Sequence, residues 1–217
     1  MSGPAPNCVV LGGGGHARVV MDAIMAEGAA TIMAVLDPNP DLWNKKIMGV
    51  PVAGGDDLLE ELAQKGADSF VVGLGSVGDA RPRQRLFQAA AALGLTPLKV
   101  VHPAAVISKW AETGPGTVAL AGGIVNIGAR LGSNVIVNTG ALVEHDCLVG
   151  DHAHLSTGCR LAGGVKVGEG AHIGAGAVVR EAISIGAGAL VAAGAVVIDE
   201  VAPGAKVAGV PAAPLKT

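Results

Sequence analysis

Residues 131–197 read LGSNVI VNTGAL VEHDCL VGDHAH LSTGCR LAGGVK VGEGAH IGAGAV VREAIS IGAGAL VAAGAV V, written in blocks of six. The first residue of every block is Leu, Ile or Val, which gives twelve aliphatic residues in an unbroken row from Leu131 to Val197. An α-helix repeats every 3.6 residues and a flat strand every two, so neither produces a strict period of six. The period therefore indicates an internally repeated architecture.

The other positions of the block predict how each repeat folds. The fifth position is small or apolar throughout, from Val135 to Ala195, and the fourth is often glycine. A large and a small apolar side chain would point inward, while glycine allows a bend with positive φ. Three short strands would close one triangular coil of about 18 residues, and successive coils would stack at ~4.8 Å, the spacing of paired strands.

The first third of the chain has a different pattern, in which strands alternate with helices. Expected strands are 8–11, 31–36 and 70–73, and expected helices run from the glycine run to 27, over 56–65 and over 81–93. This alternation predicts a small parallel α/β domain. We place it at residues 1–97 and the repeat domain at 98–217, with 102–130 read as first coils that contain insertions.

Composition agrees with a narrow, repetitive core. The 217 residues include two Phe, two Trp and no Tyr. The net charge of −3 argues against binding to nucleic acid or to an anionic membrane. The uncharged stretch 182–198 follows the repeat and is short for a membrane-spanning helix. Cys147 and Cys159 fall on the inward fifth position, and the N-terminus lacks a signal-peptide layout, so we expect a cytoplasmic protein.

The twelve blocks and the ending Gly209-Val210-Pro211-Ala212 resemble the hexapeptide-repeat acyltransferases. That resemblance implies a left-handed parallel β-helix, so the expected fold is a small Rossmann-like α/β domain followed by a left-handed parallel β-helix. The order of the domains, with G-G-H-x-R after the first strand, is similar to a narrower group. These are the sugar O- and N-acyltransferases that modify sialic acid, bacillosamine or GDP-perosamine.

The glycine run follows a strand and opens a helix, as in phosphate-binding loops. Gly12, Gly14 and Ala17 formally satisfy G-x-G-x-x-A, with Asp37 about twenty residues further on. A tight turn without a ligand, a dinucleotide site and a nucleotide-sugar site all fit this pattern. The resemblance favours the last and implies that Gly14, His16 and Asp37 bind the substrate.

His145 lies between two carboxylates in Glu144-His145-Asp146, on the outer side of the predicted coil. From the residues alone, a solvated surface cluster and a general base held by a carboxylate are both open. The resemblance implies that His145 is the catalytic base and Asp146 its orienting acid. Counting one predicted coil onward places His145 directly beneath Gly163, whose backbone N–H could bind an oxyanion.

The resemblance also implies acetyl-CoA as the acyl donor. By that match His154, Gly163, Ala175, Ala193 and Pro211 bind acetyl-CoA, and counting along the blocks places Ala175 and Ala193 above Gly163. His154 and His172 are one predicted coil apart and should stack, but no suitable third ligand stacks with them, so we expect no metal. Homotrimers are implied by the family alone.

The resulting hypothesis is an acetyl-CoA-dependent N-acetyltransferase. Its substrate would be the amino group of a nucleotide-linked 4-amino-4,6-dideoxy sugar of the GDP-perosamine or UDP-bacillosamine type. One alternative is O-acetylation of a sugar of the sialic-acid type, which the same histidine and acid would serve. A second alternative is a non-catalytic nucleotide-binding scaffold.

Overall fold

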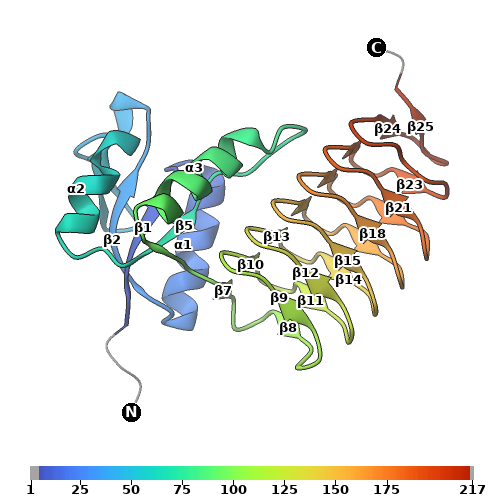
Figure 1. The fold of residues 1–217 in the computed structure, drawn as a ribbon, viewed down its shortest axis with the longest axis horizontal. Helices are drawn as coiled ribbons and strands as arrows, with labels where there is room; N and C mark the ends of the chain where they lie inside the picture. Colours follow the sequence, from blue (N-terminus) through green and yellow to red (C-terminus); the bar gives the residue numbers. More distant parts are fainter. Residues whose placement is uncertain (1–4, 216–217) are drawn as a thin grey trace.

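The computed structural model describes residues 5–215 as an α/β domain followed by a long stack of coils (Figure 1). The sheet of the first domain has the strand order β3-β4-β2-β1-β5-β6. Its central strand β1 (Asn7–Leu11) pairs in parallel with β2 (Thr31–Leu36) and with β5 (Ser69–Val72). The carboxyl ends of these strands meet at one edge, where this class of sheet places its ligands.

The predicted strands and helices of this domain are all present within a few residues of their expected bounds. The helices are α1 (Gly15–Glu27), α2 (Leu59–Gln64) and α3 (Arg81–Ala92), with short 3₁₀ turns η1 (Pro40–Leu42) and η2 (Asp56–Leu58). Additional strands are β3 (Lys46–Ile47), β4 (Val50–Gly54) and β6 (Thr96–Pro97). The antiparallel hairpin β3–β4 carries Pro51 and a glycine turn, and it was not expected from the pattern.

Strand β1 divides its side chains between two apolar layers. Cys8 and Val10 pack on the side of α1, whereas Val9 and Leu11 pack on the side of α2 and α3. This follows from the two-residue period of a strand. The α1 layer also contains Val100 from the first coil, so the core of the α/β domain continues into the repeat domain.

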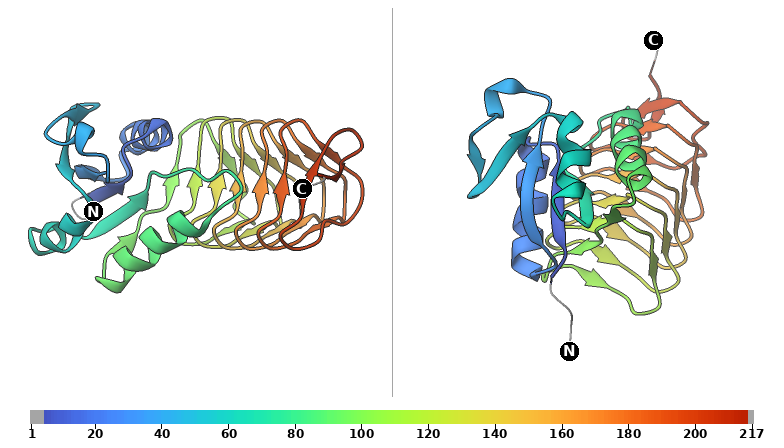
Figure 2. Two further views of the ribbon diagram at one scale, coloured as in Figure 1. Left: turned by 90° about the horizontal axis from the view of Figure 1, so that it is seen from above. Right: turned by 60° about the vertical axis from the view of Figure 1, so that its left-hand side comes forward.

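The repeat domain is a parallel β-helix with three flat sheets, which we call faces 1, 2 and 3 in chain order (Figure 2). Face 1 consists of β7 (Val100–Val101), β10 (Val118–Ala119), β13 (Ile136–Val137), β16 (His154–Leu155), β19 (His172–Ile173), β22 (Leu190–Val191), β24 (Lys206–Ala208) and β25 (Ala213–Pro214). Face 2 consists of β8 (Val106–Ile107), β11 (Ile124–Val125), β14 (Leu142–Val143), β17 (Arg160–Leu161), β20 (Val178–Val179) and β23 (Val196–Val197). Face 3 consists of β9 (Glu112–Thr113), β12 (Arg130–Leu131), β15 (Leu148–Val149), β18 (Lys166–Val167) and β21 (Ser184–Ile185).

The coil length predicted from the repeat is confirmed by the strand register. Val137 pairs with Leu155, and His154 pairs with His172, each pair being one predicted coil apart. All twelve residues of the aliphatic row are buried, as are the small fifth-position residues, among them Cys147 and Cys159. One large and one small apolar side chain per strand therefore fill a narrow interior.

The expectation of insertions between residues 102 and 130 was wrong. Val100 pairs with Val118 and Val106 with Ile124, at the same separation as in the later coils, so the coils are regular from the first strand. Thr113 and Ala119 occupy the row in this region, and these residues concealed the repeat in the sequence. Only the last coil is shorter, because Leu190 pairs with Lys206.

A column of glycines allows the coils to stack closely after each strand of face 3. A Cβ atom built on Gly150 would lie 2.6 Å from the backbone nitrogen of Glu169 in the next coil. The same conflict with the next coil arises at the equivalent positions Gly114, Gly132, Gly168 and Gly186. At this corner glycine is therefore required by the close approach of two backbones.

A buried arginine joins the two domains. Arg83 of α3 is 1% exposed, and its guanidinium donates to the carbonyl oxygens of Asn134 and of His152, the latter at 3.1 Å. Both carbonyls belong to the corner between faces 3 and 1. The long side chain thus fixes α3 against the coils, and the predicted boundary at 97/98 falls between β6 and β7. No helix in the described part of the chain is both long and apolar enough to cross a membrane.

Candidate active site

His145 and Asp146 lie together on the exposed corner between β14 on face 2 and β15 on face 3. Nδ1 of His145 lies 2.9 Å from Oδ2 of Asp146, and the His145 side chain is 58% exposed. Asp146 adopts a left-handed conformation with φ of 60°, and the absence of a side chain on Gly128, one coil below, leaves room for its carboxylate. The corner therefore holds the ring by one nitrogen, Nδ1.

The acidic neighbours also set the charge state of this histidine. The hydrogen bond that His145 donates to Asp146 is the main cause that raises the pKa of His145 above its usual value, and the negative charges of Asp146 and Glu144 add to it. The hydrogen bond of Glu144 goes to the backbone and not to the ring, because its carboxylate accepts the backbone N–H of His145 at 3.1 Å. The neutral ring would donate from Nδ1 to Asp146 and keep Nε2 free to accept a proton.

Gly163 lies directly over His145, as the predicted coil length requires. A Cβ atom built on Gly163 would lie 2.6 Å from both Nε2 and Cε1 of the ring, and the backbone N–H of Gly164 donates to the carbonyl of His145 at 2.9 Å. Among residues 5–215, no acceptor takes the N–H of Gly163. A ring nitrogen thus lies against a glycine whose backbone N–H has no acceptor in the described part of the chain.

His154 lies elsewhere, on face 1 beneath the α/β domain, and it is only 6% exposed. Its Nδ1 lies 2.7 Å from the carbonyl oxygen of Ser76, and its Nε2 lies 3.2 Å from Nδ2 of Asn138. Both contacts are satisfied if Nδ1 carries the proton and Nε2 accepts. Burial lowers the pKa of His154 to about 3, so the ring is neutral at physiological pH.

Three histidines form a row between the domains, which we call the histidine row. The ring centroid of His154 lies 4.9 Å from that of His172 and 6.1 Å from that of His16. Burial and the charge of Arg83 lower the pKa of His16 to about 4, and burial also lowers the pKa of His172. Within residues 5–215, no set of three or more His, Cys, Asp or Glu side chains is placed to hold a metal.

The glycine loop is organised by Asp37, at the end of β2. The backbone N–H of Gly13 donates to Oδ2 of Asp37 at 2.6 Å, and the N–H of Asn39 donates to Oδ1 at 2.8 Å. A Cβ atom on Gly14 or on Gly15 would meet no atom within 4 Å. The start of α1 is therefore open to an approaching group, and a helix N-terminus favours an anion there.

The structure does not gather all the predicted substrate-binding residues in one place. Gly14 lies in the glycine loop and Asp37 binds that loop from the end of β2, whereas the ring of His16 turns to the histidine row and packs beside His154. Within residues 5–215, Nε2 of His16 is buried without a hydrogen-bond partner.

The expected position of Ala175 and Ala193 above Gly163 was wrong. The N–H of Ala182 donates to the carbonyl of Gly163, just as that of Gly164 donates to His145, so residue 181 follows Gly163 in the stack, whereas Ala175 lies on the corner between faces 1 and 2. There the N–H of Gly194 donates to Ala175, which places Ala193 in the next coil of that corner. The two alanines and Pro211 are exposed, the latter beyond β24. The misplacement arose because the step from Gly163 to Ala175 covers two blocks, which advance two corners and do not complete a coil.

Several residues near these groups were missed by the sequence analysis. Ser76 and Arg83 belong to the α/β domain, and their partners in the coils lie from 51 to 78 residues away along the chain. No local pattern reports such a contact. Asn138 carried a signal that was available, because it is a polar residue within the repeat, sixteen positions before His154.

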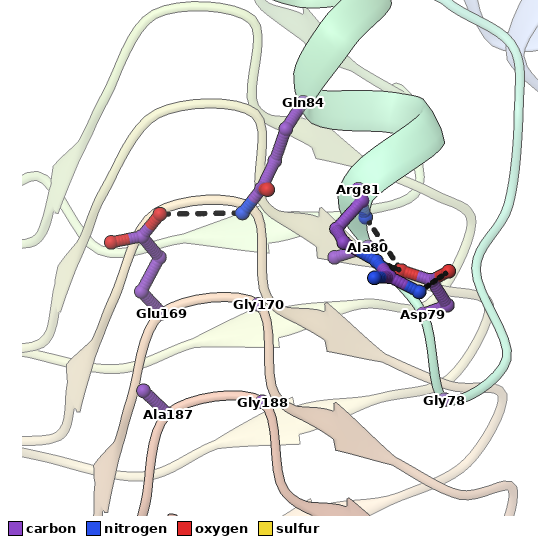
Figure 3. Close-up of a pocket in the computed structure, with 9 residues that line it drawn as sticks. All are labelled: Gly78, Asp79, Ala80, Arg81, Gln84, Glu169, Gly170, Ala187 and Gly188. Carbon is purple, nitrogen blue, oxygen red and sulfur yellow. Dashed lines mark hydrogen bonds and ion pairs between the residues drawn. The ribbon is translucent and has the colours of Figure 1, made fainter. Parts of the chain in front are cut away.

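A hollow of about 360 Å³ separates the start of α3 from the corner between faces 3 and 1 (Figure 3). Gln84 reaches across it to Glu169 at 3.2 Å, and Arg81 forms a two-bond ion pair with Asp79 (Figure 3). The paired charges satisfy each other, and His145 occupies a different corner. This hollow is therefore a seam between the domains, separate from the histidine–aspartate pair.

The coils and the exposed pair of His145 and Asp146 define a hexapeptide-repeat protein with an acyltransferase-type site. Residues 7–90 match the model of the PglD N-terminal domain. A His→Asn variant of perosamine N-acetyltransferase from Caulobacter crescentus, in complex with CoA and GDP-perosamine, is 38% identical, with a TM-score of 0.91 and 97% of each chain covered. The chain therefore belongs to the hexapeptide-repeat sugar acyltransferases, and the predicted α/β domain followed by a left-handed β-helix is confirmed.

Two further structures extend the comparison. The acetyltransferase domain of PglB from Neisseria gonorrhoeae, in complex with acetyl coenzyme A, is 35% identical, with a TM-score of 0.88 over 97% of this chain and 100% of that one. WeeI from Acinetobacter baumannii is 26% identical, with a TM-score of 0.84 over 97% of this chain and 100% of that one. A comparison with functionally curated proteins finds no match.

Proposed function

We propose that this protein transfers the acetyl group of acetyl-CoA to the amino group of a nucleotide-linked 4-amino-4,6-dideoxy sugar, of the GDP-perosamine or UDP-bacillosamine type. The observation that carries the proposal is the corner at which Nε2 of His145 lies against Gly163, whose N–H has no acceptor among residues 5–215. A base and an oxyanion donor in one space are what acyl transfer requires. The similar Caulobacter enzyme, in complex with CoA and GDP-perosamine, supports the choice of substrate.

In the proposed reaction His145 acts as the general base. A sugar amine is protonated at neutral pH and must lose a proton before it attacks. Nε2 of His145 accepts that proton, while Asp146 stabilises the resulting imidazolium through Nδ1. The amine nitrogen bonds to the thioester carbonyl carbon, and the N–H of Gly163 binds the oxyanion. The attacking nitrogen loses its second proton to solvent, the C–S bond breaks, and the imidazolium of His145 gives its proton to the leaving CoA thiolate.

Direct transfer, without an acyl-enzyme, agrees with the state of the three cysteines. All are buried, and burial raises the pKa of Cys8 and of Cys159 to about 12. Burial also raises the pKa of Cys147. A thiol must be accessible and ionised to act as a nucleophile, so none of the three is suited to carry the acetyl group.

For acetyl-CoA we propose a path along the exposed corner of Ala175 and Ala193, ending near Pro211, with His154 beside the acetyl end. Small side chains on this corner leave room for a slender pantetheine arm. For the nucleotide-linked sugar we propose Gly14, His16 and Asp37. The open space over Gly14 and the N-terminus of α1 suit a diphosphate.

We further propose that the protein works as a homotrimer in the cytoplasm, in polysaccharide biosynthesis. Face 1 is covered by the α/β domain, and His145 lies on the corner opposite it, between faces 2 and 3. A sugar held at the glycine loop of one chain would therefore reach His145 of another. Face 2 suits such an interface because five of its six outward positions are apolar: Val106, Ile124, Leu142, Val178 and Val196.

The direct test is CoA release from acetyl-CoA in the presence of GDP-perosamine. We expect turnover by the wild type and a loss of at least about 10²-fold for His145→Ala. Full activity of His145→Ala would contradict the assigned base.

Faster acetylation of sialic acid than of amino sugars would favour O-acetylation. Stabilisation by a nucleotide sugar but not by acetyl-CoA would favour a non-catalytic scaffold, and light scattering measures whether the chain is a trimer.

A further inference from the structure

A second cavity, at the carboxyl edge of the α/β sheet, has a chemistry that the catalytic proposal does not use. It has a volume of about 470 Å³, within the range of small-molecule sites. Gly12 lines it from the glycine loop, Asp37 from the end of β2, and Leu74 from the segment after β5. Helix α3 closes the other side with Pro82 and Leu86. The cavity therefore extends from the predicted phosphate loop toward α3.

Two charged side chains of opposite sign, Asp56 and Arg85, line this cavity. Neither forms an ion pair with any residue in the described part of the chain. Within the part of the chain that the structure describes, the Asp56 carboxylate accepts no hydrogen bond. Partial burial and the negative charges of Asp37 and Asp57 raise the pKa of Asp56. A ligand group that donates hydrogen bonds would stabilise the ionised form of this carboxylate.

The remaining polar group of the cavity already has a different task. Asp37 stands at the end of β2, where nucleotide-binding sheets place the carboxylate that bonds the ribose hydroxyls. Its two oxygens also accept the N–H groups of Gly13 and Asn39, which fixes its position. Asp56 and Arg85 are therefore available to bind the part of a ligand that lies beyond the ribose. The apolar side chains of Leu74, Pro82 and Leu86 line the same space.

We propose that this cavity binds the base of the nucleotide-linked sugar and that Asp56 and Arg85 select guanine over uracil. The inference rests on the proposed nucleotide-sugar substrate and names its base. Guanine presents two adjacent donors, N1–H and the N2 amine, which match the two oxygens of one carboxylate. Its other edge presents the acceptors O6 and N7, to which arginine binds in a bidentate manner.

Uracil does not offer this pattern. Its single donor, N3–H, stands between two carbonyl oxygens, and these would face the negative charge of Asp56. Adenine presents an acceptor at N1, where guanine presents a donor, and it would leave a carboxylate oxygen unpaired. Flat apolar walls hold any base, so the discrimination comes from the two charged groups.

The test measures nucleotide binding by calorimetry on the full chain without acetyl-CoA, using GDP, UDP and IDP. We expect wild-type protein to bind GDP at least about tenfold more tightly than UDP, and IDP, which lacks the N2 amine, about tenfold more weakly than GDP. Asp56→Asn should weaken GDP about tenfold and leave UDP unchanged. Arg85→Met should also weaken GDP selectively. Asp57→Asn is the matched control, since it removes a neighbouring charge outside the cavity, and it should change neither affinity.

Equal binding of GDP and UDP by the wild type, or an equal loss of both in Asp56→Asn, would overturn the assignment of the base. Retained GDP selectivity in both Asp56→Asn and Arg85→Met would overturn it as well. These outcomes are distinct from failure of the proposed function. Selective GDP binding without any CoA release would contradict the acetyl transfer and support the guanine site. Catalysis with UDP-linked sugars alone would support the acetyl transfer and contradict the guanine site.

Discussion

At the scale of single residues, the histidine–aspartate pair makes a prediction about pH. The base must be neutral to act, so kcat/KM should fall as pH drops below the pKa of His145. Because the hydrogen bond to Asp146 is the main cause that raises this pKa, Asp146→Asn should move the acidic limb of the pH–rate profile to lower pH. The rate itself should fall about 10²-fold or more, since the ring loses the carboxylate that fixes its tautomer and stabilises the imidazolium.

Glu144→Gln provides the matched control for this experiment. Glu144 contributes to the pKa of His145 only through its charge, as the last of the four causes. Glu144→Gln should therefore shift the acidic limb of the pH–rate profile less than Asp146→Asn does, and it should leave the plateau rate nearly unchanged. A limb that stays in place in Asp146→Asn would mean that another group titrates in the profile.

Gly163 makes a second prediction at this scale. A methyl group at this position would lie 2.6 Å from Nε2 and Cε1 of His145, so Gly163→Ala should displace the ring and abolish most activity. The fold should survive, because the exposed ring can turn into solvent. In a His145→Ala background the same change should cost no stability, as measured by thermal unfolding. Wild-type activity in Gly163→Ala would show that the base acts from another position.

Much of this site follows from the sequence, because the constant coil length is itself geometry. It places His145 under Gly163 and His154 under His172 without any structure. The sequence could not supply the contacts of His154 with Ser76, since these depend on how the α/β domain docks on face 1. For the same reason it did not reveal that His16 turns away from the glycine loop.

At the scale of elements, the coils depend on glycine only where backbones meet. Gly150→Ala should lower the free energy of unfolding by about 1–3 kcal/mol, because its methyl group would overlap the backbone of Glu169 in the next coil. Gly15→Ala is the control, since its methyl group would meet no atom within 4 Å and alanine favours a helix. Denaturant unfolding measures both, and equal effects would contradict this reading of the corner.

The elements themselves were predictable to different degrees. The helices of the α/β domain carry local patterns, so their bounds were found within a few residues. The first coils were judged irregular because Thr113 and Ala119 stand where aliphatic residues were expected. Backbone pairing with Leu131 and Val137 in the next coil keeps the register despite those side chains. Hydrogen bonds between coils are made by the backbone and do not depend on a perfect row.

At the scale of the whole molecule, the histidine row predicts that acid loosens the joint between the domains. The pKa of His16 falls from its ordinary value of 6.5 to about 4 in the folded protein, and that of His154 falls to about 3. Below pH 6.5 these histidines would therefore be protonated in the unfolded chain while they stay neutral in the folded protein. Stability is complete above that pH and is lost as pH falls toward 4, by about 2 kcal/mol per histidine at pH 5.

His16→Phe isolates one contribution to this effect. Within residues 5–215, Nε2 of His16 has no partner, so a phenyl ring should fit without breaking a hydrogen bond. The variant should match the wild type at pH 7 and lose less stability between pH 7 and pH 5, as followed by urea unfolding. His102→Asn is the control, because His102 lies outside the histidine row. An unchanged slope in His16→Phe would contradict the buried, neutral state of this histidine.

The constant coil length also limits how this protein can change over evolution. Deleting one residue inside the stack would rotate every later coil, move buried side chains outward and separate residues such as His145 and Gly163, which meet only because they lie one coil apart. Length can change without that damage by whole coils, or in the coil before β24, which is already shorter than the others. Such a chain would lengthen by whole coils, and the corner that holds His145 and Gly163 would stay intact each time.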